Sequence, residues 1–326
     1  MARVPVIDIG PALGAPASPD RTSVVVDELR SACEDTGFFL VKGHGVAAEK
    51  IDAVVAAAHS FFALPVELKA RSVTGGPRGY HPLNQASLAQ SRGETSPPDL
   101  AEVYSVGRFD DPAEALRSGL RPGAEGYFAP NAWPDQPAGF RPAFEEYYGA
   151  LERLANDLLG LFALALGLPR SWFADKADRH ISNLMVNYYP AQVEPPLPGQ
   201  LRRGAHSDWG SLTVLFQDDS PGGFELLNQS GDWEPVPAVP GTFVVNIGDL
   251  LAMWTNDRWR STVHRVVNPS RADADRARVS IPYFHQPNFD AVIECIPSCL
   301  APGEVPRHAP TTSGAWLQSM LAAVAY

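Results

Sequence analysis

The chain has 326 residues, enough to bury a large core as one domain or two, and carries a formal net charge of −11 at pH 7. This acidic balance argues against nucleic acid or an anionic membrane as the main partner, because both attract basic surfaces. The longest apolar run, 158–168, is too short to span a bilayer. With three cysteines and no signal-peptide pattern in its first residues, the sequence predicts a cytoplasmic protein.

Helical periodicity predicts the main helices. Apolar residues recur at helical spacing in four segments, 22–34, 48–62, 142–166 and 312–324. Gly37 is a usual helix terminator after the first of these. Between 75 and 137 the sequence is rich in Gly, Pro, Ser and Asp, which predicts loops and short strands wrapped around the core.

From 180 to 287 the pattern changes to short strands and turns, as in a jelly roll. Two apolar runs rich in β-branched and aromatic residues, 212–216 and 242–247, are the clearest strands, and the second is followed by a Gly-Asp turn signal. We therefore expect an α+β fold with a double-stranded β-helix core, flanking helices and a mixed, largely helical N-terminal region. The expected division is 1–175, 176–295 as the catalytic core, and 296–326 as a tail helix packed on it.

A candidate metal site lies at the start of this strand-rich region. His206 and Asp208 stand one residue apart, and side chains at positions i and i+2 of a strand point to the same face. His264, from another strand, would be the third ligand. Two imidazoles and one carboxylate on one side of a metal, with the other side open, are the ligand set of oxygen-activating non-haem Fe(II). The alternative is an ordinary polar turn at the end of a strand.

A second polar pair follows fourteen residues after His264. Arg278 and Ser280 are again at positions i and i+2, and they lead into an apolar stretch. A guanidinium binds two carboxylate oxygens at once, and a hydroxyl adds a further donor, so the pair can clamp a carboxylate. A structural ion pair is the alternative.

Taken in order, His206-x-Asp208, His264 and Arg278-x-Ser280 resemble the iron(II)- and 2-oxoglutarate-dependent dioxygenases, in the branch that contains isopenicillin N synthase and anthocyanidin synthase. The resemblance covers nearly the whole chain. Further matches lie in the segments 4–8, 37–46, 61–65 and 187–190. Three departures stand outside the ligands: Ser207 replaces the commoner Thr, Asn256-Asp257 stands where Asn-Gly is frequent, and the polar segment 271–276 lengthens the connection between His264 and Arg278.

This resemblance implies the cofactors and the remaining site residues. Fe(II), 2-oxoglutarate as cosubstrate and O2 are expected, with succinate and CO2 as products beside an oxidised small molecule of specialised metabolism, such as antibiotic biosynthesis. Tyr189 and Asn187 would assist Arg278 and Ser280 in binding the cosubstrate. Four residues are expected near the prime substrate: Phe284, Tyr80, His81 and Trp209. Hydroxylation is the preferred reaction, with desaturation and ring formation as alternatives.

Two other functions stay open at this point. Isopenicillin N synthase shares the Arg-x-Ser pair yet uses no 2-oxoglutarate, so the clamp could hold the substrate's own carboxylate. In a different class, the chain could be a non-catalytic jelly-roll binding module, although such a protein needs neither a ligand triad nor a clamp. The sequence indicates neither the identity of the prime substrate nor the oligomeric state.

Overall fold

The computed structural model describes residues 4–13, 19–85, 87–111, 113, 116, 129–220 and 223–324. The helices are α1 (Gly10–Leu13), α2 (Pro19–Asp35), α3 (Ala48–Phe62), α4 (Val66–Lys69), α6 (Phe140–Ala165), α7 (Ala174–Ala177), α8 (Asp249–Trp254) and α9 (Ser313–Ala323), with 3-10 turns η1 (Ala70–Ser72), η2 (Leu88–Arg92), η4 (Arg271–Asp273) and η5 (Pro297–Cys299). The strands are β1 (Val6–Asp8), β2 (Phe38–Lys42), β3 (Gly79–His81), β4 (Glu102–Gly107), β5 (Asn183–Tyr189), β6 (Arg203–His206), β7 (Leu212–Gln217), β8 (Phe224–Leu227), β9 (Trp233–Pro235), β10 (Phe243–Ile247), β11 (His264–Val266), β12 (Arg278–His285), β13 (Val292–Ile293) and β14 (Thr311–Thr312).

A large sheet runs through the molecule in the order β1-β2-β10-β7-β12-β5-β4-β3, and a smaller one has the order β6-β11-β8-β9. Apart from the parallel pair β1 and β2, neighbouring strands of these two sheets are antiparallel. One cluster of buried side chains joins them, with Leu40, Leu215 and Val244 from the large sheet and Leu226 and Val266 from the small one. The two sheets therefore face each other as a jelly roll, which confirms the predicted α+β class.

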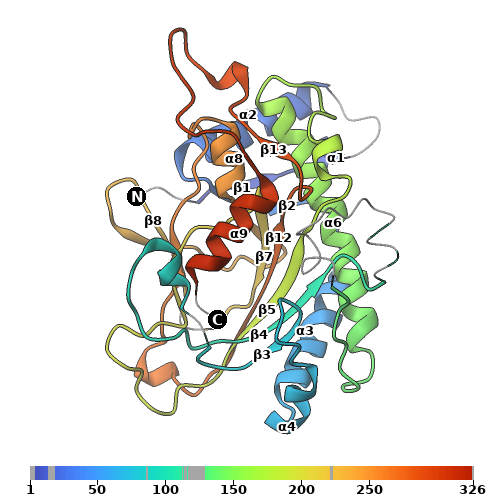
Figure 1. The fold of residues 1–326 in the computed structure, drawn as a ribbon, viewed down its shortest axis with the longest axis vertical. Helices are drawn as coiled ribbons and strands as arrows, with labels where there is room; N and C mark the ends of the chain where they lie inside the picture. The colour runs from blue at the N-terminus through green and yellow to red at the C-terminus, as the bar shows by residue number, and fades with distance from the viewer. Residues whose placement is uncertain are drawn as a thin grey trace.

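The other face of the large sheet is covered by helices. Figure 1 shows α3 and the long α6 on this side, next to the strands β3, β4 and β5. The stripe of α6 that includes Phe144, Leu151 and Leu158 is fully buried, and it belongs to the same cluster as Val186 and Ile281 of the sheet. Alternation along each strand thus divides the sheet residues into a helix-facing set and a set inside the jelly roll.

The predicted helices are confirmed within a few residues, since 22–34, 48–62, 142–166 and 312–324 correspond to α2, α3, α6 and α9. After α2, Gly37 has a φ of 68°, in the left-handed region, as expected at a helix end. The Gly248-Asp249 signal lies at the end of a strand, as expected. Strand β10 ends at Ile247, immediately before this signal, and Gly248 is the residue before the short helix α8.

The N-terminal part of the chain contributes to the same large sheet. Strands β1 to β4 all precede residue 175, yet β2 pairs with β10 and β4 pairs with β5. The division of the chain into three domains stays a prediction.

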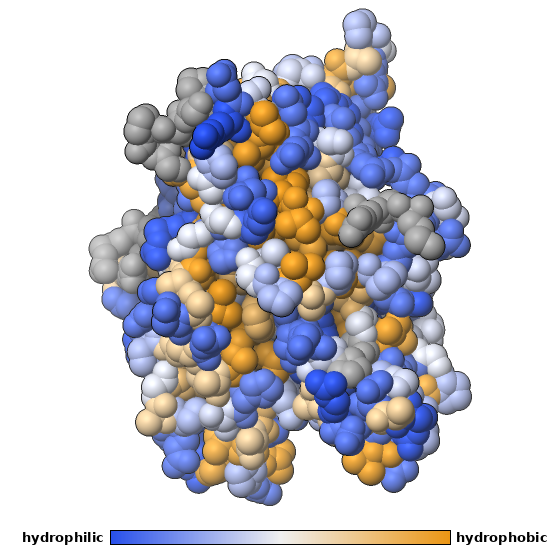
Figure 2. Space-filling model, turned by 180° about the vertical axis from the view of Figure 1, so that it is seen from behind, coloured by the Kyte–Doolittle hydropathy of each residue, from blue (hydrophilic) through white to orange (hydrophobic). Residues whose placement is uncertain are grey.

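Among the described residues no single helix is long and apolar enough to cross a membrane. In the same part of the chain, only the helical segments 48–62 and 66–72, taken together, have sufficient length and apolar composition, and they are bent by 115° relative to each other. On the face shown in Figure 2, apolar residues gather in a central band between hydrophilic ones.

Candidate metal centre

Three buried side chains meet at one end of the jelly roll. His206 ends β6, His264 begins β11, and these two residues are directly paired across the strands. Asp208 lies two residues beyond the end of β6, so the predicted placement of both ligands on one strand was wrong, although the side chains do converge. The Nε2 atoms of His206 and His264 are 3.8 and 3.5 Å from Oδ1 of Asp208. Potential ligand atoms of all three lie within 4.8 Å of one another.

Hydrogen bonds to the backbone orient both imidazoles. Nδ1 of His206 lies 2.8 Å from the carbonyl oxygen of Gly204, and Nδ1 of His264 lies 3.0 Å from that of Thr262. A carbonyl can only accept, so each Nδ1 carries a proton, and Nε2 is the ring atom that is left to bind a metal. This is the tautomer that a metal requires, and it is set by the chain itself.

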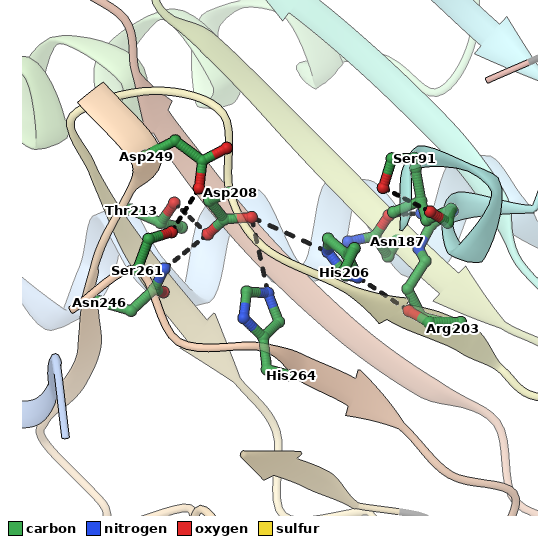
Figure 3. A network of polar contacts seen from close by, with 12 residues as sticks. Ser91, Asn187, Arg203, His206, Asp208, Thr213, Asn246, Asp249, Ser261 and His264 are labelled. Carbon is green, nitrogen blue, oxygen red and sulfur yellow. Dashed lines mark hydrogen bonds and ion pairs between the residues drawn. The ribbon is translucent and has the colours of Figure 1, made fainter. Parts of the chain in front are cut away.

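The carboxylate of Asp208 is held by its second oxygen. Oδ2 accepts hydrogen bonds from Oγ1 of Thr213, at 2.5 Å, and from Nδ2 of Asn246, at 2.6 Å. Figure 3 shows both donors on one side of the carboxylate and the two histidines on the other. Oδ1 is therefore left to face His206 and His264, as a monodentate ligand would.

A further carboxyl group joins the two ligand-bearing segments. The backbone N–H of Asp249 donates to the carbonyl oxygen of Asp208 at 2.8 Å, and Oδ1 of Asp249 accepts from Ser261 at 2.6 Å. Burial raises the pKa of Asp249 to about 6, and the negative charge of Asp208 acts in the same direction. Hydrogen bonds from the Ser261 and Ser207 hydroxyls lower this pKa, but by less. A hollow of about 800 Å³ is lined by Ser207, Asp249 and Ser261, among others, but by none of the three ligands.

Electrostatics within the triad favour a neutral His206 and an ionised Asp208. Burial, reinforced by His264, lowers the pKa of His206 to about 3. Burial alone would raise the pKa of Asp208 and lower that of His264. The attraction between the two groups outweighs the effect of burial on each. The pKa of Asp208 therefore lies below the ordinary value of an aspartate, and the pKa of His264 lies above that of a histidine. A divalent cation would take the place of the proton that His264 and Asp208 share. Two imidazole nitrogens and one carboxylate oxygen are suitable ligands for such a cation.

The predicted clamp lies on the inner side of the large sheet. In β12, Val279, Ile281 and Tyr283 belong to the helix-facing core, so Arg278 and Ser280 face the inside of the jelly roll. The Arg278 side chain is buried, and its Nη2 donates to Oε1 of Gln217 at 2.9 Å. Its Nη1 has no hydrogen-bond partner among the described residues, and the carboxylate of Asp218 is 3.9 Å from Nε.

Tyr189 and Asn187 complete this inner surface. Tyr189 is paired with Arg278 and Asn187 with Ser280 across β5 and β12. The guanidinium carbon of Arg278 lies 5.4 Å from the Tyr189 ring centre, and the Tyr189 hydroxyl is 3.5 Å from Oγ of Ser280. The four predicted cosubstrate residues are therefore neighbours, and they surround a buried, incompletely satisfied positive charge.

The residues predicted near the substrate do not all face the centre. Phe284 is on the inner side of β12 and pairs with Thr213, which holds Asp208. His81 pairs with Val103, an inner-side residue. Trp209, half-buried, follows Asp208 directly, and its indole N–H has no hydrogen-bond partner in the part of the chain that the structure describes. These three positions are compatible with a substrate pocket, but their contact with a substrate stays a prediction.

The predicted position of Tyr80 near the substrate was wrong. It lies on the helix-facing side of β3, where it packs against Phe61 and Phe62 and its hydroxyl donates to Glu102. Glu102 in turn binds Lys69 at 2.5 Å. Strand alternation sends neighbouring residues to opposite faces, so Tyr80 and His81 cannot both face the metal.

Comparison with known proteins agrees with this geometry. Residues 180–287 match the 2OG-Fe(II) oxygenase superfamily, and residues 4–136 match the non-haem dioxygenase N-terminal region named for morphine synthesis. A 2-oxoglutarate-Fe(II) type oxidoreductase of Emericella nidulans is 34% identical over 99% of this chain and 92% of its own length. A homoarginine-6-hydroxylase of Oryza sativa subsp. japonica is 33% identical, with 91% and 89% covered.

Solved structures agree as well. A full-length Neurospora crassa protein, crystallised with alpha-KG and thymine, has a TM-score of 0.84 and 29% identity, and the match covers 98% of this chain and 96% of that one. The metal and the 2-oxo acid that this family uses fit the donor set and the unsatisfied guanidinium described above. The chain therefore belongs to the iron(II)- and 2-oxoglutarate-dependent oxygenase family.

Proposed function

We propose that this oxygenase holds Fe(II) with His206, Asp208 and His264, binds the distal carboxylate of 2-oxoglutarate at Arg278, and hydroxylates a small organic molecule. The observation that carries the proposal is the buried Nη1 of Arg278, which has no partner among the described residues although it lies inside the jelly roll that also bears the triad. A buried donor without an acceptor costs free energy, and a bound carboxylate removes that cost.

The chain's own residues supply orientation and a dry site. Iron and 2-oxoglutarate provide the oxidative chemistry, in which O2 is consumed and succinate and CO2 are formed. Gln217 fixes the Arg278 fork, and Ser280 and Tyr189 place hydroxyl groups beside it. Thr213 and Asn246 hold the Asp208 carboxylate so that one oxygen remains for the metal.

The proposed prime substrate is a small molecule. Homoarginine appears in the names of several relatives, and the Neurospora crassa structure contains thymine, so related chains handle compounds of this size. Phe284, His81 and Trp209 are the residues that we propose for the pocket wall. The net charge of −11 supports the same choice over nucleic acid. We further propose a cytoplasmic location, which suits the three free cysteines.

The first experiment tests cosubstrate use in the native protein. Fe(II)-loaded protein is titrated with 2-oxoglutarate without oxygen, and the metal-to-ligand absorption band is recorded. Oxygen uptake and succinate are then measured with and without 2-oxoglutarate, while candidate amino acids, nucleobases and aromatic acids are screened for products carrying one added oxygen atom.

Two histidine variants serve as a matched pair in this assay. His206→Ala removes a ligand and should abolish both the band and succinate formation. His308→Ala removes a half-exposed imidazole that binds Asp257 at 2.9 Å, so both signals should persist. Oxygen uptake that needs no 2-oxoglutarate would contradict the proposal and favour an oxidase of the isopenicillin N synthase type.

A further inference from the structure

Strand β6 contains a bulge next to the metal centre. His264 pairs with His206, but Val266 pairs with Arg203, so β6 uses three steps where β11 uses two. One extra residue in a strand reverses the alternation beyond it. Arg203 therefore points to the same side as His206, into the jelly roll, whereas in a regular strand it would face away.

In this orientation Arg203 contacts Asn187 of β5 and the buried carboxylate of Asp99. Its Nη2 donates to Oδ1 of Asn187, and its Nη1 lies 3.3 Å from the carboxylate of Asp99. The side chain of Arg203 is 13% exposed and that of Asp99 is 3% exposed. Figure 3 shows Arg203 and Asn187 on the His206 side of the centre, away from Asp249.

The contact with Arg203 fixes which way the Asn187 amide faces. A guanidinium has only donors, so the amide atom against it must be the oxygen. The amide nitrogen, Nδ2, must then point away from Arg203, and it makes no hydrogen bond with any described residue. Asn187 is paired with Ser280 and is two residues from Tyr189, so this donor belongs to the inner surface that carries the clamp.

We propose that Arg203 is a positioning residue, which holds the Asn187 amide so that its N–H group donates to an oxygen of the bound 2-oxo acid. The inference rests on the proposed function, because it assumes that 2-oxoglutarate occupies the space between the triad and Arg278. With the Arg203 guanidinium in place, the Asn187 amide is oriented before the ligand binds. Without it, the amide can rotate and present its oxygen, which repels a carboxylate.

Asp99 fixes Arg203 in turn. Its carboxylate accepts from the backbone N–H of Gly204 at 2.9 Å and from that of Leu88 at 3.2 Å, besides its contact with Arg203. One buried carboxylate thus joins the bulged strand to η2. The order of action runs from Asp99 through Arg203 to Asn187, and then to the ligand.

The test uses Arg203→Met and Asn187→Asp, measured by anaerobic titration of 2-oxoglutarate into Fe(II)-loaded protein. Asn187→Asp keeps an acceptor for Arg203 and removes the donor, while Arg203→Met keeps the amide and frees it. Each should weaken 2-oxoglutarate binding on the order of tenfold or more. The Fe(II) affinity, measured separately, should stay within about threefold, because the metal ligands are untouched.

A double variant separates positioning from a direct contact. If Arg203 acts through Asn187, adding Arg203→Met to Asn187→Ala should change 2-oxoglutarate affinity by less than about twofold. Losses that simply multiply would overturn the proposal. Should Arg203→Met fail to fold, Arg203→Lys is used instead, since it keeps the charge but cannot hold Asp99 and Asn187 together. Native affinity in that variant would overturn the proposal as well.

Arg265→Met is the matched control. Arg265 follows His264 directly, but its guanidinium binds Glu225 at 2.8 Å and lies over the Trp233 ring. Its loss should leave the absorption band and the affinity for 2-oxoglutarate unchanged. A native protein without the band would overturn the proposed function and this inference together, whereas a normal native band with unaffected Arg203 variants would overturn the inference alone.

Discussion

Replacing Arg278 by Met tests how the site distinguishes a dicarboxylate from other 2-oxo acids. Met has a similar reach, so packing is largely kept while the positive charge is removed. In the native protein Arg278 is 1% exposed, its guanidinium donates to Gln217 at 2.9 Å, and Nη1 is left for a ligand. In the variant, the distal carboxylate would meet an apolar side chain, with the carboxylate of Asp218 still nearby.

The expected loss follows from this geometry. Removing one partner of a buried, hydrogen-bonded charge pair costs about 2–5 kcal/mol, or roughly thirtyfold to several-thousandfold in affinity. Because Asp218 remains and repels the ligand, we expect the upper part of this range. Arg278→Lys should restore part of the affinity, since an ammonium keeps the charge but not the two-pronged geometry.

The assay is the anaerobic titration of 2-oxoglutarate into Fe(II)-loaded protein. The Fe(II) affinity of the Arg278→Met variant should be nearly native, since Arg278 is not among the metal ligands. A 2-oxo acid of the same length without the distal carboxylate should bind native and variant protein about equally. Native 2-oxoglutarate affinity in the variant, together with weaker binding of a prime substrate, would refute the reasoning and assign the clamp to that substrate.

Three further results are expected. Asn246→Leu removes a donor to Asp208 and should lower Fe(II) affinity by about ten- to a hundredfold without unfolding the protein, as anaerobic metal titration and circular dichroism would show. Since the Asp208 carboxylate, against burial, holds the pKa of metal-free His264 above its ordinary value, Fe(II) affinity should decline about tenfold per pH unit on acidification below that pKa, and a flat profile below neutral pH would contradict this. Tyr80→Phe should cost about 1–3 kcal/mol in denaturant unfolding, through the lost bond to Glu102, and a changed 2-oxoglutarate affinity would argue against its place on the helix side.

Local patterns were sufficient for the main helices and for selecting His206, Asp208 and His264, which the structure does bring together. The stripe on α6 and the strand-rich region have periodicities that survive folding, and His264 comes from a second strand as expected. The placement of Asp208 failed by two residues, because the sequence does not show where pairing between β6 and β11 stops.

The supporting residues could not be paired from the sequence, because each comes from a distant strand. Asn246 was the most accessible signal, as a lone amide within the apolar run of β10. Its partner Asp208 becomes evident only from the register of β10 against β7, which pairs Asn246 with Thr213. The role of Arg203 was harder still to predict, since in a regular strand its side chain would point out of the jelly roll. The error at Tyr80 has the same origin, because β3 is short and its inner face is decided by pairing with β4.

The pairing of β2 with β10 has a consequence for how the protein is made. On the ribosome, β2 emerges early, but its partner across the Val41–Phe243 pair follows only after the intervening chain has been translated. At about 5–20 residues per second, β2 waits for roughly 10–40 s with one edge unpaired. Its four apolar residues, Phe38 to Val41, form the type of exposed edge that recruits other chains. Nascent chains should therefore depend on chaperones until β10 arrives, and slower translation of the intervening segment should increase aggregation more than it lowers the stability of the finished protein.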